Sequence, residues 1–116
     1  MNLSDMLKPA VAAALLAAAP TLLAAEAGDP AAGERKTAMC QGCHGISGYK
    51  TAFPEVYHVP RLGGQHAAYI VKALQEYKAG NRSHPSMRAI AAGLSDKDMA
   101  DLAAYYAAAP AKTAAK

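Results

Sequence analysis

The sequence has very few of the large aromatic side chains that normally fill the core of a small domain. Its 116 residues contain one phenylalanine, Phe53, and no tryptophan. A chain of this length forms one domain at most, and so small a domain usually needs a cross-link or a bound group for stability. No internal repeat is visible. The shortage of large apolar residues therefore favours a domain whose centre is filled by a cofactor.

Cysteine is also scarce, since the chain has only Cys40 and Cys43. There is no second cysteine pair, and His58, His66 and His84 are not spaced as in a zinc finger, so the sequence disfavours a zinc site. A thioredoxin-like redox pair requires a βαβ context, and no strand-rich pattern surrounds the cysteines. A disulfide across two intervening residues would be strained and would add little stability. These three possibilities are the alternatives to the interpretation that follows.

Both cysteines belong to one pentapeptide, Cys40-Gln41-Gly42-Cys43-His44. A C-x-x-C-H run is typical of covalent attachment of c-type haem. The two thiols bond to the haem vinyl groups, and the adjacent histidine becomes a ligand of the iron on one side. We therefore predict one covalent haem c, with Cys40 and Cys43 as thioether positions and His44 as an iron ligand.

The N-terminal stretch is predicted to be a secretory signal peptide covering residues 1–27. Lys8 supplies a weak positive charge, residues 9–25 are almost wholly apolar, and Ala25-Glu26-Ala27 resembles an A-x-A cleavage site. Cleavage is expected after Ala27, with Ala25 as the second choice. An uncleaved membrane anchor is the alternative. Export leaves a single domain over residues 28–116 in the periplasm, without stable membrane insertion.

Helix signals divide this domain into three main helices. Asp29 and Pro30 are a favourable N-cap and first residue for a helix over residues 30–41. An apolar stripe predicts a helix over 65–79 closed by Gly80, and Ser95 begins a helix that runs to about residue 109. Residues 45–64 and 81–93 are expected to be loops, the second with a short helical turn at 86–92. The fold class is therefore all-α, with three helices and loops around one haem.

The chain resembles the class I cytochromes c, in particular the small bacterial periplasmic type, and is similar to one half of the two-domain dihaem cytochromes of that group. The residues that carry the resemblance cover nearly all of the predicted mature domain. They are Gly33, the CQGCHG run from Cys40, the segment from Pro60 to Tyr69, Gly80-Asn81-Arg82, Met87, Leu94-Ser95-Asp96 and the LAAYY run from Leu102.

The resemblance implies a role for several residues outside the motif. Gly33 would lie where the first and last helices cross, near Leu102 and Tyr105. The Pro60 carbonyl would accept a hydrogen bond from the ring N–H of the histidine ligand, which fixes its orientation. Leu62 would pack on the haem, and Met87 would be the second axial ligand of the iron.

The remaining methionines and histidines also favour Met87 as that ligand. Met39 adjoins the first cysteine, and Met99 lies on the inward stripe of a helix, where core packing is the expected role. Met87 lies well downstream of the motif, in a segment able to reach the opposite haem face. A core-filling role for Met87, or ligation by His84 in its place, is the alternative.

Iron with His and Met ligands has no open coordination position, so the resemblance implies a one-electron carrier and not an enzyme. Expected partners are redox proteins: a dehydrogenase or quinol-oxidising complex as donor and a terminal oxidase or reductase as acceptor. The alternatives are a dedicated cytochrome subunit of one oxidoreductase and a ligand-binding haem protein. No feature supports nucleic-acid binding, and a monomer or weak homodimer is expected. The basic side chains either surround an exposed haem edge, where they would steer an acidic partner, or are scattered over the surface. They are Lys50, Arg61, Lys72, Lys78, Arg82 and Arg88.

Overall fold

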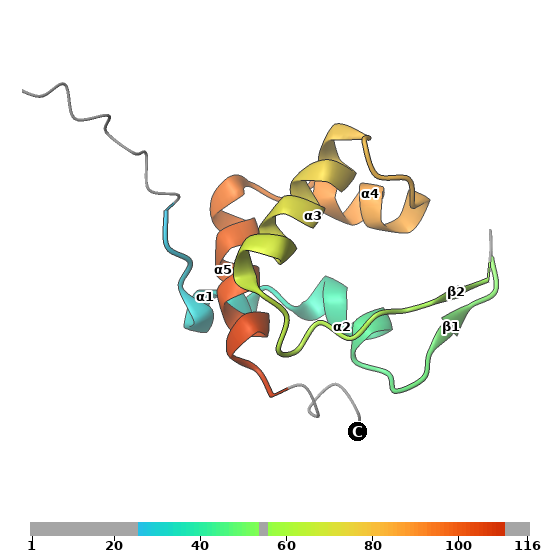
Figure 1. The fold of residues 1–116 in the computed structure, drawn as a ribbon, viewed down its shortest axis with the longest axis horizontal. Coiled ribbons are helices and arrows are strands. Elements are labelled where there is room, and N and C mark those ends of the chain that lie inside the picture. Colours follow the sequence, from blue (N-terminus) through green and yellow to red (C-terminus); the bar gives the residue numbers. More distant parts are fainter. Residues whose placement is uncertain (1–25, 54–55, 111–116) are drawn as a thin grey trace, which may run out of the picture.

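The computed structural model describes residues 26–53 and 56–110, which form five helices and one small hairpin (Figure 1). The sequence-predicted signal peptide lies almost wholly outside these residues. In the described part of the chain, no helix is both long and apolar enough to cross a membrane. The elements are α1 (Pro30–Arg35), α2 (Ala38–His44), β1 (Lys50–Thr51), β2 (Tyr57–His58), α3 (Ala67–Ala79), α4 (Pro85–Ala92) and α5 (Asp96–Ala108).

The first helix packs across the last one at a glycine. Asp29 caps α1 by accepting a hydrogen bond from the Ala31 N–H at 2.9 Å, and Pro30 follows as its first residue. Gly33 is buried, and a β-carbon on it would lie 2.0 Å from the Asp101 carbonyl oxygen and 2.8 Å from the Tyr105 β-carbon. The expected crossing at Gly33 is therefore present, centred on Asp101 and Tyr105.

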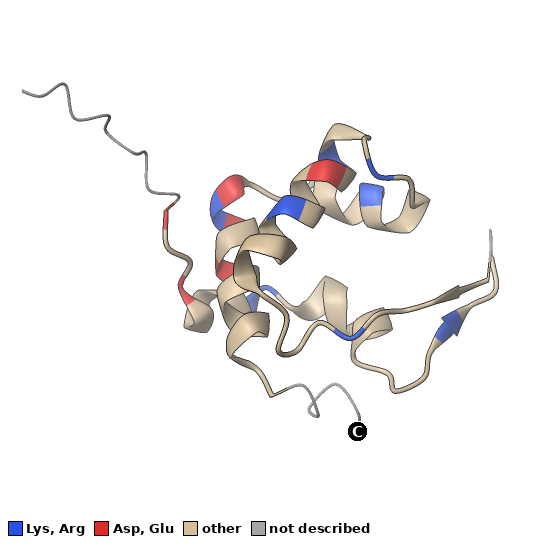
Figure 2. Cartoon of the chain, in the orientation of Figure 1, with Lys and Arg blue, Asp and Glu red and all other residues tan. Residues whose placement is uncertain are grey.

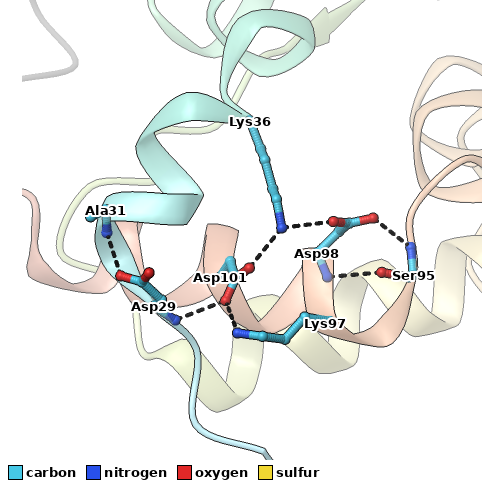
Figure 3. A network of polar contacts seen from close by, with 7 residues as sticks. All are labelled: Asp29, Ala31, Lys36, Ser95, Lys97, Asp98 and Asp101. Carbon is cyan, nitrogen blue, oxygen red and sulfur yellow. Dashed lines mark hydrogen bonds and ion pairs between the residues drawn. The ribbon is translucent and has the colours of Figure 1, made fainter.

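An ion network joins the same helices (Figure 3). The buried Asp101 carboxylate accepts hydrogen bonds from the Asp29 N–H at 2.8 Å and from the Lys36 ammonium at 2.7 Å, and it also pairs with Lys97. Lys36 makes a second ion pair, 2.8 Å long, with Asp98. The chain between α1 and α2 is thereby fixed to the start of α5.

The apolar core lies where α3, α4 and α5 meet. Its buried residues are few, and none is aromatic: Ile70, Leu74, Ala91, Met99 and Ala103. The buried position of Met99 confirms the packing role expected for it. The α3 helix ends at Gly80, which has the left-handed φ of 83° expected for a glycine C-cap.

The all-α fold class is confirmed, but two local expectations were wrong. The helix expected over 30–41 is broken at Lys36–Thr37 into α1 and α2. The loop expected over 45–64 contains the antiparallel β1–β2 pair, in which Lys50 lies opposite His58. The helical turn expected at 86–92 is present, as the helix α4, which begins one residue earlier because His84 and Pro85 provide its N-cap and first residue.

Candidate haem site

The C-x-x-C-H motif forms most of α2. Cys40 lies in the middle of this helix and is half-buried, and Cys43 is exposed. His44 is the last residue, and Gly45 caps the helix. Among the described residues, no group of three or more His, Cys, Asp or Glu is placed to hold a metal ion by itself.

Thr37 positions the motif helix against the preceding turn. Its buried hydroxyl donates to the Glu34 carbonyl and accepts from the Gln41 side-chain amide, both at 2.8 Å. Its carbonyl accepts hydrogen bonds from the Cys40 and Gln41 N–H groups. Lys36, immediately before it, is held by the ion network on α5. The helix that carries both cysteines therefore has its first turn anchored on the framework.

The ring of His44 is oriented by a backbone carbonyl. Its Nδ1 lies 2.7 Å from the Pro60 carbonyl oxygen. A carbonyl oxygen can only accept, so Nδ1 carries the proton and donates, which leaves the lone pair on Nε2 for a metal. This contact is the one that the resemblance implies, and it sets the tautomer that an iron ligand requires. The ligand role itself stays a prediction.

The segment after Pro60 is tied to the end of α5. The Gly64 N–H donates to the Tyr106 carbonyl at 3.0 Å, and a β-carbon on Gly63 would lie 2.8 Å from the Pro110 carbonyl oxygen. Leu62, which lies between Pro60 and these two glycines in the chain, is half-buried. Its packing on the haem stays a prediction.

Met87 comes from α4, the helix that follows α3. Its side chain is half-buried and packs against the core cluster that contains Ile70 and Met99. In Figure 1, α3 and α4 lie above α2 and the hairpin, and both groups extend to the same side of α5. The predicted ligands His44 and Met87 therefore belong to two groups of elements that face each other in this view.

His84, the alternative ligand, has other contacts. It is the N-cap of α4, where its Nδ1 accepts a hydrogen bond from the Met87 N–H at 3.4 Å. Its ring centroid lies 4.9 Å from that of Tyr57 on β2 and 6.5 Å from that of Tyr77 on α3. These contacts join the hairpin to α4 and favour a structural role for His84 beside Met87.

The described residues fit a large apolar group bonded to α2. One fit is at the first cysteine of the motif, because Cys40 is half-buried. Burial raises the pKa of the Cys40 thiol, while Tyr106 opposes that rise. The other fit is the exposed apolar side chains near the motif and on the hairpin, which include Met39, 70% exposed, Ile46, 49% exposed, and Tyr57, 44% exposed.

Sequence reasoning missed Lys36, Thr37 and Tyr106 as parts of this site. Thr37 carried a signal, because a threonine before a helical segment is a favourable N-cap type, although its hydroxyl here bonds in other ways. Lys36 and Tyr106 gave no local signal, since the residues that they bond, Asp101 and Gly64, lie more than 40 residues away in the chain.

Comparison with known proteins gives one family match. The family model described as Cytochrome c matches residues 30–108. Cytochrome c4 of Pseudomonas aeruginosa is 42% identical over 93 residues, which are 80% of this chain and 44% of that protein. Cytochrome c-554(548) of Halomonas halodenitrificans is 45% identical over 83 residues, which are 69% of this chain and 95% of that protein.

Two further matches bear on architecture and partners. The crystal structure of reduced recombinant cytochrome c4 from Pseudomonas stutzeri has a TM-score of 0.51 and 33% identity, covering 72% of this chain and 50% of that one. A protein of Stutzerimonas stutzeri named thiosulfate dehydrogenase electron acceptor is 42% identical over 72 residues, which are 62% of this chain and 32% of that protein. The chain thus spans less than half the length of the cytochrome c4 relative and nearly all of the shorter cytochrome c-554(548).

Proposed function

The chain belongs to the cytochrome c family, and on that basis we propose that it is a one-electron carrier whose iron is held by His44 and Met87. Covalently attached haem c is the cofactor of this family, and when bound it supplies the change between ferric and ferrous iron. The observation that carries the proposal is the 2.7 Å contact between His44 Nδ1 and the Pro60 carbonyl, because it presents Nε2 as a ligand.

Different residues of the chain would attach the haem, pack against it and bind its iron. Cys40 and Cys43 would attach it covalently, and Leu62 would pack against it next to the Pro60–His44 pair. Met87 would close the opposite face, from a helix whose start is fixed by the His84 cap. A site closed on both faces leaves the iron no position for substrate, so rigid positioning is the contribution of the protein.

We also propose where this carrier works and what it meets. Residues 1–27 would be cleaved as a signal peptide, leaving the domain 28–116 in the periplasm as a monomer or weak homodimer. A dehydrogenase or a quinol-oxidising complex would donate electrons, and a terminal oxidase or reductase would accept them.

The basic side chains provide one surface for such partners. Figure 2 shows Lys and Arg on the hairpin, α3 and α4. Some are engaged locally: Lys72 pairs with Glu76 at 2.6 Å, Lys78 donates to the Leu94 carbonyl, and the Arg82 guanidinium lies 4.9 Å from the Tyr77 ring centroid. Lys50, Arg61 and Arg88 are exposed and would attract an acidic partner.

A dedicated subunit of one oxidoreductase is the second candidate. It is supported by the exposed apolar hairpin, where Phe53 is 88% and Val56 72% exposed, and by the similarity to a protein named as an electron acceptor. If the protein is a free carrier, replacing both residues by serine would leave its elution volume unchanged. If it is a subunit of a permanent complex, the same replacement would dissociate the complex. Size-exclusion chromatography of the protein from its native cells, at its native level, would separate the two.

A spectroelectrochemical titration of the purified haem-loaded protein tests the carrier function. We expect one reversible one-electron transition and no binding of carbon monoxide to the reduced protein, because both axial positions are filled. Rapid carbon monoxide binding would contradict the proposal and would indicate a ligand-binding haem protein.

A further inference from the structure

Two histidines of the chain are held in opposite tautomers. His44 donates from Nδ1 to the Pro60 carbonyl, which leaves the lone pair on Nε2. At His84, by contrast, Nδ1 accepts a hydrogen bond from the Met87 N–H at 3.4 Å. A neutral imidazole has one donor and one acceptor nitrogen, so Nε2 of His84 carries the proton and has no lone pair for a metal. In this form His84 does not compete for iron through Nε2, and its role lies in what it holds.

The backbone that His84 holds is that of the predicted ligand itself. His84 is the N-cap of α4, with extended backbone, and Pro85 follows as the first helical residue. Met87 is the third residue of the helix, and its N–H is one of the first four, which have no acceptor within a helix. The imidazole supplies that acceptor, so the cap bond joins His84 directly to Met87.

The imidazole ring is held in turn by aromatic rings of two other elements. Its centroid lies 4.9 Å from that of Tyr57 on β2, with 58° between the planes, and 6.5 Å from that of Tyr77 on α3, with 79° between the planes. Tilted and edge-on arrangements are the ones that aromatic rings prefer. Tyr77 also packs against the core cluster. His84 therefore links the hairpin and α3 to the first turn of α4.

The connection that leads from α3 to His84 has contacts of its own. The Arg82 N–H donates to the Glu76 carbonyl at 3.2 Å. The Arg82 guanidinium lies 4.9 Å from the Tyr77 ring centroid and donates to the Tyr69 hydroxyl at 3.3 Å. Because these contacts do not involve the imidazole, we expect its removal to loosen the first turn of α4 and to leave α3 in place.

We propose that His84 is a positioning residue for the axial methionine, because its ring ties the backbone of Met87 to the hairpin and to α3. This inference rests on the proposed ligation of the iron by Met87. Release of the methionine sulfur requires the first turn of α4 to move, and the cap bond and the two ring contacts oppose that movement. Without the imidazole the methionine still binds, but a competing ligand displaces it more easily.

Imidazole titration of the oxidised, haem-loaded protein tests the proposal, since imidazole must displace the methionine to bind the iron. We expect His84→Ala to bind imidazole about tenfold more tightly than the wild type, which is about 1.4 kcal/mol and corresponds to the loss of a cap and a ring contact. His84→Asn keeps a capping side chain but not the ring, so its gain should be about threefold.

His66→Ala is the matched control. His66 is also an N-cap histidine, at α3, but its side chain makes no cap hydrogen bond. This variant should bind imidazole as the wild type does. An unchanged affinity in His84→Ala, with or without a loss of stability, would mean that His84 is structural only and would overturn the proposal. An equal gain in His66→Ala would also overturn it.

His84→Asn keeps the proposal testable if His84→Ala does not take up haem. A gain in imidazole affinity in His84→Asn then supports the positioning role, and the affinity of the wild type contradicts it. Failure of Met87 ligation itself would appear separately, because the oxidised wild type would then lack the near-infrared band of an iron-bound methionine.

Discussion

The framework helices α1, α3, α4 and α5 and the motif region, residues 38–59, are built by different means. The framework is held by direct protein contacts: a glycine crossing, the Asp101 ion network and a small apolar core. The motif region has no buried residue among those described, and its exposed fraction reaches 88% at Phe53. The framework is therefore held by contacts within the chain, and we expect the motif region to obtain its packing from the haem.

The largest expected effect is on stability, and it compares the same glycine-to-alanine substitution in the two regions. Gly33→Ala would place a β-carbon 2.0 Å from the Asp101 carbonyl oxygen, so α1 must move off α5. We expect a loss of about 3 kcal/mol in the free energy of unfolding, at the upper end of overpacking effects. Chemical denaturation of the haem-loaded protein would measure it.

Gly42→Ala in the motif helix is the matched control. A β-carbon there would meet no atom within 4 Å, and alanine favours a helix over glycine by up to about 1 kcal/mol. We expect unchanged or slightly increased stability. An equal loss in both variants would mean that the two regions are not packed differently.

The second prediction concerns the response of the framework to acid. Ion pairing with Lys36 lowers the pKa of Asp98 from 3.8 to about 2 and holds that of Asp101 well below its usual range. A lowered folded-state pKa contributes stability above pH 3.8, and this contribution is lost as pH falls through the folded value. We expect wild-type stability to fall between about pH 4 and pH 2, with a shallower fall in Asp101→Asn.

Asp96→Asn provides the control for this acid response, because Asp96 lies on the same helix, in the first turn of α5 with Asp98, but outside the network. Equilibrium denaturation at a series of pH values would give the slopes. A slope in Asp101→Asn as steep as that of the wild type would show that the network does not set acid stability.

The smallest expected effect is at the C-cap of α3. Gly80 has a φ of 83°, a conformation that costs an L-residue roughly 1–2 kcal/mol. Gly80→Ala should therefore destabilise the protein by about 1 kcal/mol. Gly93→Ala, at a C-cap with a φ of −85°, should change stability much less, and similar losses in thermal unfolding of the two variants would contradict the role assigned to Gly80.

The sequence predicted the elements whose signals are local. Ser95 and Asp98 form the expected capping box, with bonds of 3.1 and 3.0 Å, and Gly80 closes α3 as expected. The resemblance to cytochromes c also predicted that α1 and α5 approach each other closely at Gly33. These features depend on a few neighbouring residues or on one recognisable motif.

The features that sequence reasoning missed depend on distant partners. Asp101 can be buried at low cost because its carboxylate is paired with Lys36, Lys97 and the Asp29 N–H. Nothing in the local sequence of α5 indicates that this residue is buried. The break after Arg35 places Lys36 in that network, and a helical pattern alone does not reveal it. The hairpin is only two residues per strand, too short to produce a periodic signal.

The central claim is that one ligand from each region closes on the iron, His44 from α2 and Met87 from α4. Near-infrared absorption of the oxidised, haem-loaded protein tests it most directly, since a methionine sulfur bound to ferric iron gives a weak band there. We predict this band in the wild type and in His84→Ala, and its loss in Met87→Ala. Absence of the band from the wild type, or its survival in Met87→Ala, would contradict the account.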